Sequence, residues 1–154
     1  MRLTRLVLTA VFCLAATVAC FAADLNVGTF KLNEAKSKLA AGTPKINTIV
    51  YTQEGDQYKC VIDGVDASGN PTHNEWIGKF DGKDYPVTGD PHADMREIKK
   101  VDDHHYKGSN KKDGKTVLTT AVVYSPDGKT RTLTVNATDS NGKKVSSTYV
   151  FDRQ

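Results

Sequence analysis

Clusters of turn residues divide the chain after Asp24 into short segments, and several of these clusters contain an Asp-Gly or Asn-Gly pair, such as Asp113-Gly114 and Asn141-Gly142. Such pairs reach positive φ at low steric cost and therefore favour tight hairpin turns. The segments between the turns are about 8 to 12 residues long, which is typical of antiparallel sandwiches and barrels. The long crossovers that parallel strands need do not fit into connections of this length.

The segments between the turns are rich in Thr, Val, Tyr and Ile, and several alternate between apolar and polar residues. Leu133, Val135 and Ala137, for example, share one face of a single predicted strand. The helix-like stretch is short and covers Asn33–Leu39. We predict strands at Val27–Leu32, Ile46–Gln53, Gln57–Gly64, Thr72–Phe80, Tyr85–Val87, Met95–Val101, His105–Asn110, Thr116–Tyr124, Thr130–Thr138 and Val145–Phe151.

A meander of this many short strands closes into a barrel or folds into two packed sheets. Closure removes exposed strand edges, and no long connection of the Greek-key type is visible. We therefore predict an all-β fold, a single up-and-down antiparallel β-barrel of about eight to ten strands, in which Thr29–Leu32 lies beside Thr148–Phe151. A barrel of this size can hold one small ligand inside.

The first 23 residues have the layout of a secretory signal peptide. Two arginines are followed by the uncharged run Leu6–Phe21 and by small residues before Asp24. The apolar run of about 16 residues is shorter than the roughly 20 that span a bilayer. We predict a signal peptide over residues 1–23, cleaved after Ala22 or Ala23, and a barrel domain over residues 24–154 that is periplasmic or secreted.

The three cysteines refine this prediction. Ala16–Cys20 loosely resembles a bacterial lipoprotein box, so a lipid anchor at Cys20 is an open alternative to a soluble exported protein. Cys13 and Cys20 leave with the signal peptide, and Cys60 then has no disulfide partner within the chain. We expect Cys60 to be a small buried hydrophobic residue rather than a reactive thiol.

Charge argues against nucleic acid as a partner. The chain has 21 Lys and Arg against 18 Asp and Glu, and removal of Arg2 and Arg5 leaves 19 against 18. A nearly neutral mature domain has no strong field to attract nucleic acid or an anionic membrane. The locally basic stretch Lys111–Lys115 is interpreted as a hairpin tip. The sequence makes no prediction of the oligomeric state.

No arrangement of reactive residues indicates catalysis. The four histidines are His73, His92, His104 and His105, and they form no HxH or HExxH pattern. Adjacent residues on a strand point to opposite faces, so we expect His104 and His105 not to line one site. No serine stands in a Gly-x-Ser-x-Gly elbow, and no glycine-rich phosphate loop is present. We therefore predict no enzyme activity, no metal site and no cofactor.

Three runs of residues resemble a known family. GTFKLNEAKSK over Gly28–Lys38, FDGKDYPVTG over Phe80–Gly89 and the closing Tyr149–Gln154 are similar to small exported bacterial proteins described as lipocalin-like. Gly28-Thr29-Phe30 also resembles the Gly-x-Trp opening of lipocalins, with Phe in place of Trp. The resemblance implies a β-barrel and carries over no catalytic residue.

Glycine and phenylalanine at the start of the domain suit the floor of such a barrel, where Gly28 permits close backbone approach and Phe30 plugs the end. Pro86 cannot donate to a strand ladder, so we expect it at an edge or rim. The turn-rich stretch from Phe80 to Asp94 is a candidate lid over a cavity, and the alternative is that it merely turns a corner of the barrel.

The aromatic residues are the candidates for ligand contact. On one predicted strand Asn74, Trp76 and Phe80 share a face that we expect to point inward, with Asn74 as a buried polar group needing a partner. The predicted function is a non-catalytic exported carrier of a small, partly apolar or amphipathic molecule. The alternative is an envelope protein-interaction or structural module whose core is filled by the same rings. The predicted ligand-binding residues are Phe30, Tyr58, Asn74, Trp76, Phe80 and Tyr85.

Overall fold

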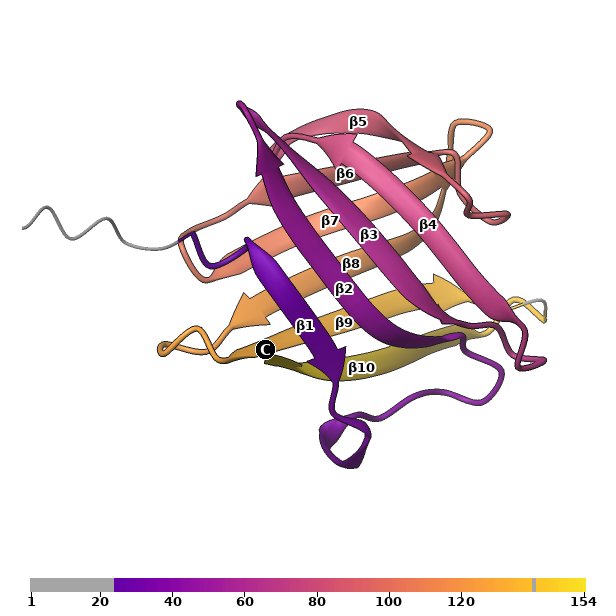
Figure 1. The fold of residues 1–154 in the computed structure, drawn as a ribbon. Helices are drawn as coiled ribbons and strands as arrows, with labels where there is room; N and C mark the ends of the chain where they lie inside the picture. Colours follow the sequence, from indigo (N-terminus) through magenta and orange to yellow (C-terminus); the bar gives the residue numbers. More distant parts are fainter. Residues whose placement is uncertain (1–23, 140) are drawn as a thin grey trace, which may run out of the picture.

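A computed structural model describes residues 24–139 and 141–154. The predicted signal peptide, its cleavage site and Cys20 lie outside the described residues. The rest of the chain forms one closed antiparallel barrel (Figure 1). Its elements are β1 (Gly28–Leu32), the 3₁₀ turn η1 (Glu34–Lys36), β2 (Lys45–Glu54), β3 (Gln57–Val65), β4 (Pro71–Gly78), β5 (Asp81–Thr88), β6 (Met95–Lys100), β7 (His105–Lys112), β8 (Lys115–Tyr124), β9 (Thr130–Thr138) and β10 (Lys144–Arg153).

Closure joins the first strand to the last. Each strand pairs with its neighbours in sequence, and β1 pairs with both β2 and β10. In Figure 1, β1 lies beside β10. Phe30 stands opposite Arg153, and Leu32 stands opposite Phe151. The predicted up-and-down barrel, including the contact between its first and last strands, is confirmed.

The turn between β7 and β8 shows how Asp-Gly pairs make the hairpins. Asp113 and Gly114 have φ values of 50° and 75°. Two successive residues with positive φ match the right-handed twist of the flanking strands and let them pair directly. The regular spacing of such pairs therefore produces the regular meander that the sequence predicts.

The strand β5 differs most from its predicted form. It runs from Asp81 to Thr88 and not merely over Tyr85–Val87, because a register shift between Asp81 and Asp84 absorbs the Asp-Gly-Lys turn as a bulge. Pro86 is exposed within β5, and the pairing of β5 with β4 is confined to Glu75 with Thr88 and Trp76 with Val87. The strand that contains Pro86 thus takes part in the shortest strand pairing of the barrel, that of β4 with β5.

The two ends of the barrel are built differently. We call the end that holds residues 24–27 and the turn between β8 and β9 the floor, and the opposite end, which holds residues 89–94 and the turn between β7 and β8, the mouth. The prediction that the stretch from Phe80 to Asp94 forms one lid is wrong, because β5 runs from the floor to the mouth between these two residues. Only residues 89–94 reach the mouth.

The floor is sealed around Phe30, which is fully buried. Arg153 lies over its ring, with the guanidinium carbon 4.7 Å from the ring centroid. Arg153 also donates hydrogen bonds to the carbonyl oxygens of Leu25, Val27 and Gly128. Gly28 has φ of 141°, and a Cβ at this position would lie 2.6 Å from Nη1 of Arg153. The expected roles of Gly28 and Phe30 at the floor are therefore confirmed.

The hydrophobic core is aromatic and lies inside the barrel. Cys60 is fully buried in it, as expected, and is a free thiol. Among the described residues, no helix has the length and apolarity needed to cross a bilayer. The core residues are Phe30, Ile49, Tyr51, Cys60, Trp76, Val87, Tyr106, Val122, Tyr124, Leu133, Tyr149 and Phe151.

Candidate ligand site inside the barrel

Strand register identifies the positions that face inward, because paired residues share a face and every second residue follows them. Toward the floor these positions are buried, as at Cys60, Trp76 and Leu133. Toward the mouth the same inward rows continue with residues that stay partly exposed. They are Ile62, Asn74, Thr120 and Val135. These inward positions are therefore less completely buried than the aromatic positions toward the floor.

The floor half is filled by interlocking aromatic rings. The ring of Phe80 stacks on Tyr58 at 4.3 Å between centroids and meets the ring of Tyr106 edge-on at 5.2 Å. Tyr124 lies between Tyr106 and Phe30, with a centroid distance of 5.9 Å to each. Such offset and edge-to-face pairs add to the stability gained by burial, so this half is a packed core.

The hydroxyl groups of these rings are satisfied at the floor. Asn26 is buried, donates from Nδ2 to the hydroxyl oxygen of Tyr106 over 2.7 Å, and accepts from the hydroxyl of Tyr124 over 3.1 Å. The hydroxyl of Tyr58 donates to Oδ2 of Asp24 over 2.5 Å. Burial, followed by this hydrogen bond, raises the pKa of Tyr58 to about 12. Residues 24–26 thus act as a polar plug under the rings.

The structure brings five of the six predicted ligand-binding residues together. Phe30, Tyr58, Trp76 and Phe80 belong to or pack against the floor half, and the ring of Tyr85 meets Trp76 edge-on at 6.1 Å. Phe80 lies beyond the end of β4, which stops at Gly78 rather than at Phe80 as predicted. The inward orientation of Trp76 is confirmed by its 1% exposure. Contact of these residues with a ligand stays a prediction.

The sixth predicted residue, Asn74, lies in the mouth half and has the polar partner that it was expected to need. Its Oδ1 accepts a hydrogen bond of 3.2 Å from Nη2 of Arg96. Arg96 also donates from Nε to Oδ1 of Asn110 over 3.1 Å, and its carbonyl oxygen accepts from the indole of Trp76 over 3.1 Å. Two neutral amides therefore hold this buried guanidinium.

A second arginine, Arg131, lies inside the barrel with 5% of its surface exposed. Its guanidinium carbon lies 5.8 to 6.0 Å from the ring centroids of Phe30, Tyr51, Tyr124 and Phe151. The described hydrogen bonds give it a single side-chain partner, the hydroxyl oxygen of Tyr124, which accepts from Nε over 3.3 Å. Its Nη1 is buried without a partner.

Our sequence analysis missed both arginines as site residues, although a signal was present. Arg131 shares its strand face with Leu133 and Val135, and Arg96 shares its face with Ile98. A charged residue on an otherwise apolar strand face faces the core if the strand is part of a barrel.

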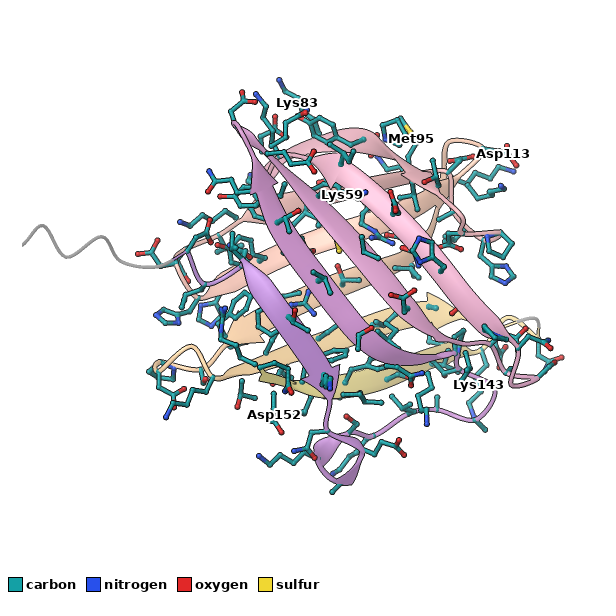
Figure 2. All side chains as sticks on the ribbon, viewed as in Figure 1. Lys59, Lys83, Met95, Asp113, Lys143 and Asp152 are labelled. Carbon is teal, nitrogen blue, oxygen red and sulfur yellow. The ribbon has the colours of Figure 1, made fainter. Side chains whose placement is uncertain are left out.

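The inward positions of the ten described strands carry no Asp or Glu to balance these two charges. In the ion pairs within residues 24–139 and 141–154, the basic partner is always Lys or His and never Arg. One example is Lys59, on the outer face of β3 (Figure 2), whose Nζ lies 2.9 Å from Oε2 of Glu75. The acidic groups therefore lie on the outer face or at the ends of the barrel.

Two hollows lie at the ends of the barrel. The one at the mouth has a volume of about 490 Å³ and is open to solvent. It lies at the ends of β8, β9 and β10, where its walls include inward-facing residues (Leu118, Ala137 and Val145) and outward-facing ones (Thr119, Asn136 and Ser146). The one at the floor has a volume of about 540 Å³ and is bordered by both His104 and His105. Our expectation that these two histidines could not line one site is wrong, because His104 precedes β7 and is not on the strand.

The remaining histidines show no metal-binding arrangement. His73 lies on the outer face of β4, where Nδ1 is 2.7 Å from Oδ1 of Asp63 and Nε2 is 3.4 Å from Oε1 of Glu75. The hydrogen bond to Asp63 raises the pKa of this exposed histidine. Within the described ranges, no three His, Cys, Asp or Glu side chains are placed to hold a metal ion together.

No family model and no curated protein matches the chain. Solved structures with a similar fold include apocrustacyanin C1, at 13% identity and a TM-score of 0.45, and lobster apocrustacyanin A1, at 13% identity and a TM-score of 0.44. The matches cover 85% and 86% of this chain but 62% and 63% of those chains. The chain thus spans less than two thirds of their length, and the likeness is one of overall fold.

Proposed function

We propose that the protein is a non-catalytic, exported carrier that holds a small, partly apolar molecule inside the barrel, in the periplasm or outside the cell. Export rests on the signal-like residues 1–23 and on the resemblance to exported bacterial proteins. The carrier role rests on the barrel interior.

The observation that carries this proposal is the incomplete burial of several inward-facing residues in the mouth half. Ile62 and Val135 face inward and pack against the core, yet each keeps part of its surface exposed. Asn74 and Thr120 add polar groups to the same wall. An apolar wall with a few polar groups, open at one end, is the usual composition of a small-molecule site.

Titration with the neutral dye Nile red tests the proposal. We expect saturable 1:1 binding, seen as a blue-shifted and stronger emission, because the dye moves from water to an apolar wall. Val135→Trp fills the mouth half from inside and should abolish binding. Val123→Trp is the matched control on the adjacent strand, because Val123 faces outward with 40% of its surface exposed.

Two results would contradict the carrier role. One is the absence of saturable binding to the wild-type protein, and the other is an equal effect of the two tryptophan variants. Either result favours the alternative function, an envelope protein-interaction or structural module that uses the barrel only as a scaffold.

A further inference from the structure

Two adjacent histidines border one hollow at the floor of the barrel. This hollow of about 540 Å³ is lined by His104, in the turn between β6 and β7, and by His105, at the start of β7. The outward-facing Val123 and the exposed Pro126 form another part of its wall. None of the six predicted ligand-binding residues lines it. The proposed carrier function therefore does not account for this hollow.

A carboxylate orients the ring of His105. Its Nδ1 lies 2.8 Å from Oδ1 and 3.0 Å from Oδ2 of Asp102. The same Oδ1 accepts hydrogen bonds of 2.9 Å from the backbone N–H groups of His104 and His105. Because a carboxylate only accepts hydrogen bonds, Nδ1 of His105 carries the proton of the neutral ring, and Nε2 keeps its lone pair.

A backbone carbonyl orients the ring of His104 in the same sense. Its Nδ1 lies 3.3 Å from the carbonyl oxygen of Tyr124, whose own backbone N–H donates to the carbonyl oxygen of His104 over 2.9 Å. This acceptor again places the proton on Nδ1. The hydrogen bonds of the described residues involve Nε2 of neither histidine. Each ring thus keeps one unprotonated nitrogen free.

His73 has a different arrangement, in which the protein itself engages both nitrogens. Its Nδ1 lies 2.7 Å from Oδ1 of Asp63, and its Nε2 lies 3.4 Å from Oε1 of Glu75. No ring nitrogen of His73 is therefore left for a ligand. The pair at the floor differs because each of its rings has one nitrogen engaged and one free.

Charge at the hollow favours a cation. The carboxylates of Asp102 and Asp103 both border it, and Nζ of Lys100, 2.8 Å from Oδ1 of Asp103, offsets only part of their charge. Neutral imidazole nitrogens suit zinc, nickel and copper ions, whereas magnesium and calcium ions prefer oxygen ligands.

We propose that His104 and His105 bind a divalent transition metal ion through their Nε2 atoms, with water in the remaining coordination positions. A ligating histidine ordinarily donates its other ring N–H to a carboxylate or a backbone carbonyl, and these are the acceptors of His105 and His104. We had predicted no metal site from the sequence, and expected the two rings to face opposite ways, but His104 precedes β7. Two protein ligands suffice for this site, so it agrees with the absence of a three-ligand cluster among the described residues.

Calorimetric titration with ZnCl₂ tests this inference on protein purified without a histidine tag. We expect one Zn²⁺ per chain and no binding of MgCl₂. His104→Ala and His105→Ala should each weaken Zn²⁺ binding by about 10-fold or more, because each removes one of the two ligands. His73→Ala is the matched control, because it removes an exposed histidine from the outer face of β4 and should leave the affinity unchanged.

Asp102→Asn tests the role of the carboxylate behind His105. Asparagine keeps an Oδ1 acceptor for the two backbone N–H groups, so the turn is retained, but it removes the negative charge. We expect Zn²⁺ to bind about 10-fold more weakly, because outer partners of ligating histidines raise their basicity. Long-range ¹H–¹⁵N NMR spectra give an independent readout: both rings should carry the proton on Nδ1 before metal is added, and Zn²⁺ should shift the Nε2 signals.

The contrary outcomes are equally specific. Wild-type affinity in a variant that lacks both histidines, equal weakening by His73→Ala, or a proton on Nε2 of both rings in the metal-free protein would each overturn the site. These substitutions lie outside the barrel interior, so the carrier function and its Nile red test stand in either case.

Discussion

The floor and the mouth of this barrel are made from the same strands but differ in the size and burial of their inward-facing side chains. In the floor half, large rings interlock and every tyrosine hydroxyl around Asn26 has a partner. In the mouth half, smaller inward residues such as Val135 and Thr120 stay partly exposed. Large aromatic residues fill a barrel interior, whereas small and aliphatic ones leave part of it open.

The two halves of the closed sheet therefore differ in how much they contribute to stability. The floor half buries most of the aromatic surface and therefore contributes most of the stability. The mouth half contributes less packing, and its inward residues are less completely buried. Arg131 stands among the floor rings but lacks the complete hydrogen bonding of its neighbours there.

The largest expected effect comes from removing a floor ring. Phe30→Ala deletes a fully buried side chain beneath Arg153 and should lower the free energy of unfolding by about 3 to 5 kcal/mol, measured by urea denaturation. Val135→Ala removes a partly exposed side chain of the mouth half and should cost about 1 kcal/mol. Equal losses in the two variants would show that both halves are packed alike.

Substitution of the two arginines that face the rings should change the free energy of unfolding by a smaller amount, and in opposite directions. Arg153→Met leaves three carbonyl oxygens without their donor and should lower the free energy of unfolding by about 2 kcal/mol. Arg131→Met removes an uncompensated buried charge and should raise it by about 1 kcal/mol in the ligand-free protein. Thermal unfolding of both variants measures the signs, and destabilisation by both would make Arg131 a structural residue like Arg153.

The smallest expected effect is the pH dependence of the plug at the floor. Burial raises the pKa of Asp24, but hydrogen bonds from Tyr58 and Asn26 outweigh burial and hold the pKa below its ordinary value of 3.8. A carboxyl group whose pKa is lowered by folding stabilises the protein above its unfolded-state pKa, and this stability is lost as the pH falls through the lowered value. Denaturation between pH 7 and 2 should therefore show a decline that is smaller in Tyr58→Phe.

Tyr149→Phe is the control for that experiment. The hydroxyl of Tyr149 donates to the carbonyl oxygen of Pro44 over 2.6 Å and does not touch a carboxylate. Its loss should lower stability without changing the shape of the acid decline. An identical acid decline in wild type and Tyr58→Phe would show that the hydrogen bond to Asp24 does not set its pKa.

The fold was accessible from the sequence because the signals are local. Asp-Gly and Asn-Gly pairs act within their own hairpins, and strand alternation is visible within nine residues, as in Thr130–Thr138. The short connections then leave an up-and-down order as the simple arrangement. The error at β5 arose because an Asp-Gly pair was interpreted as a turn, whereas the register with β6 makes it a bulge within a strand.

The candidate site could be predicted from the sequence only in part. The inward face of Trp76 and the need of Asn74 for a partner followed from alternation. The identity of that partner did not, because Arg96 lies 22 residues further along the chain and meets Asn74 across the interior. The surroundings of Arg131 could not be predicted either, because its ring neighbours come from four different strands, β1, β2, β8 and β10.

By itself, the sequence determined the antiparallel order of about eight to ten strands, most of their hairpins and the inward face of rings such as Trp76. These features depend on backbone preferences and on a period of two residues, both of which act over short distances. Only the tertiary structure decided that the inward residues of one half are more completely buried than those of the other, and that two inward-facing arginines have no acidic partner among the described residues. Packing and charge balance depend on which distant side chains meet, and closure of the barrel is what brings them together.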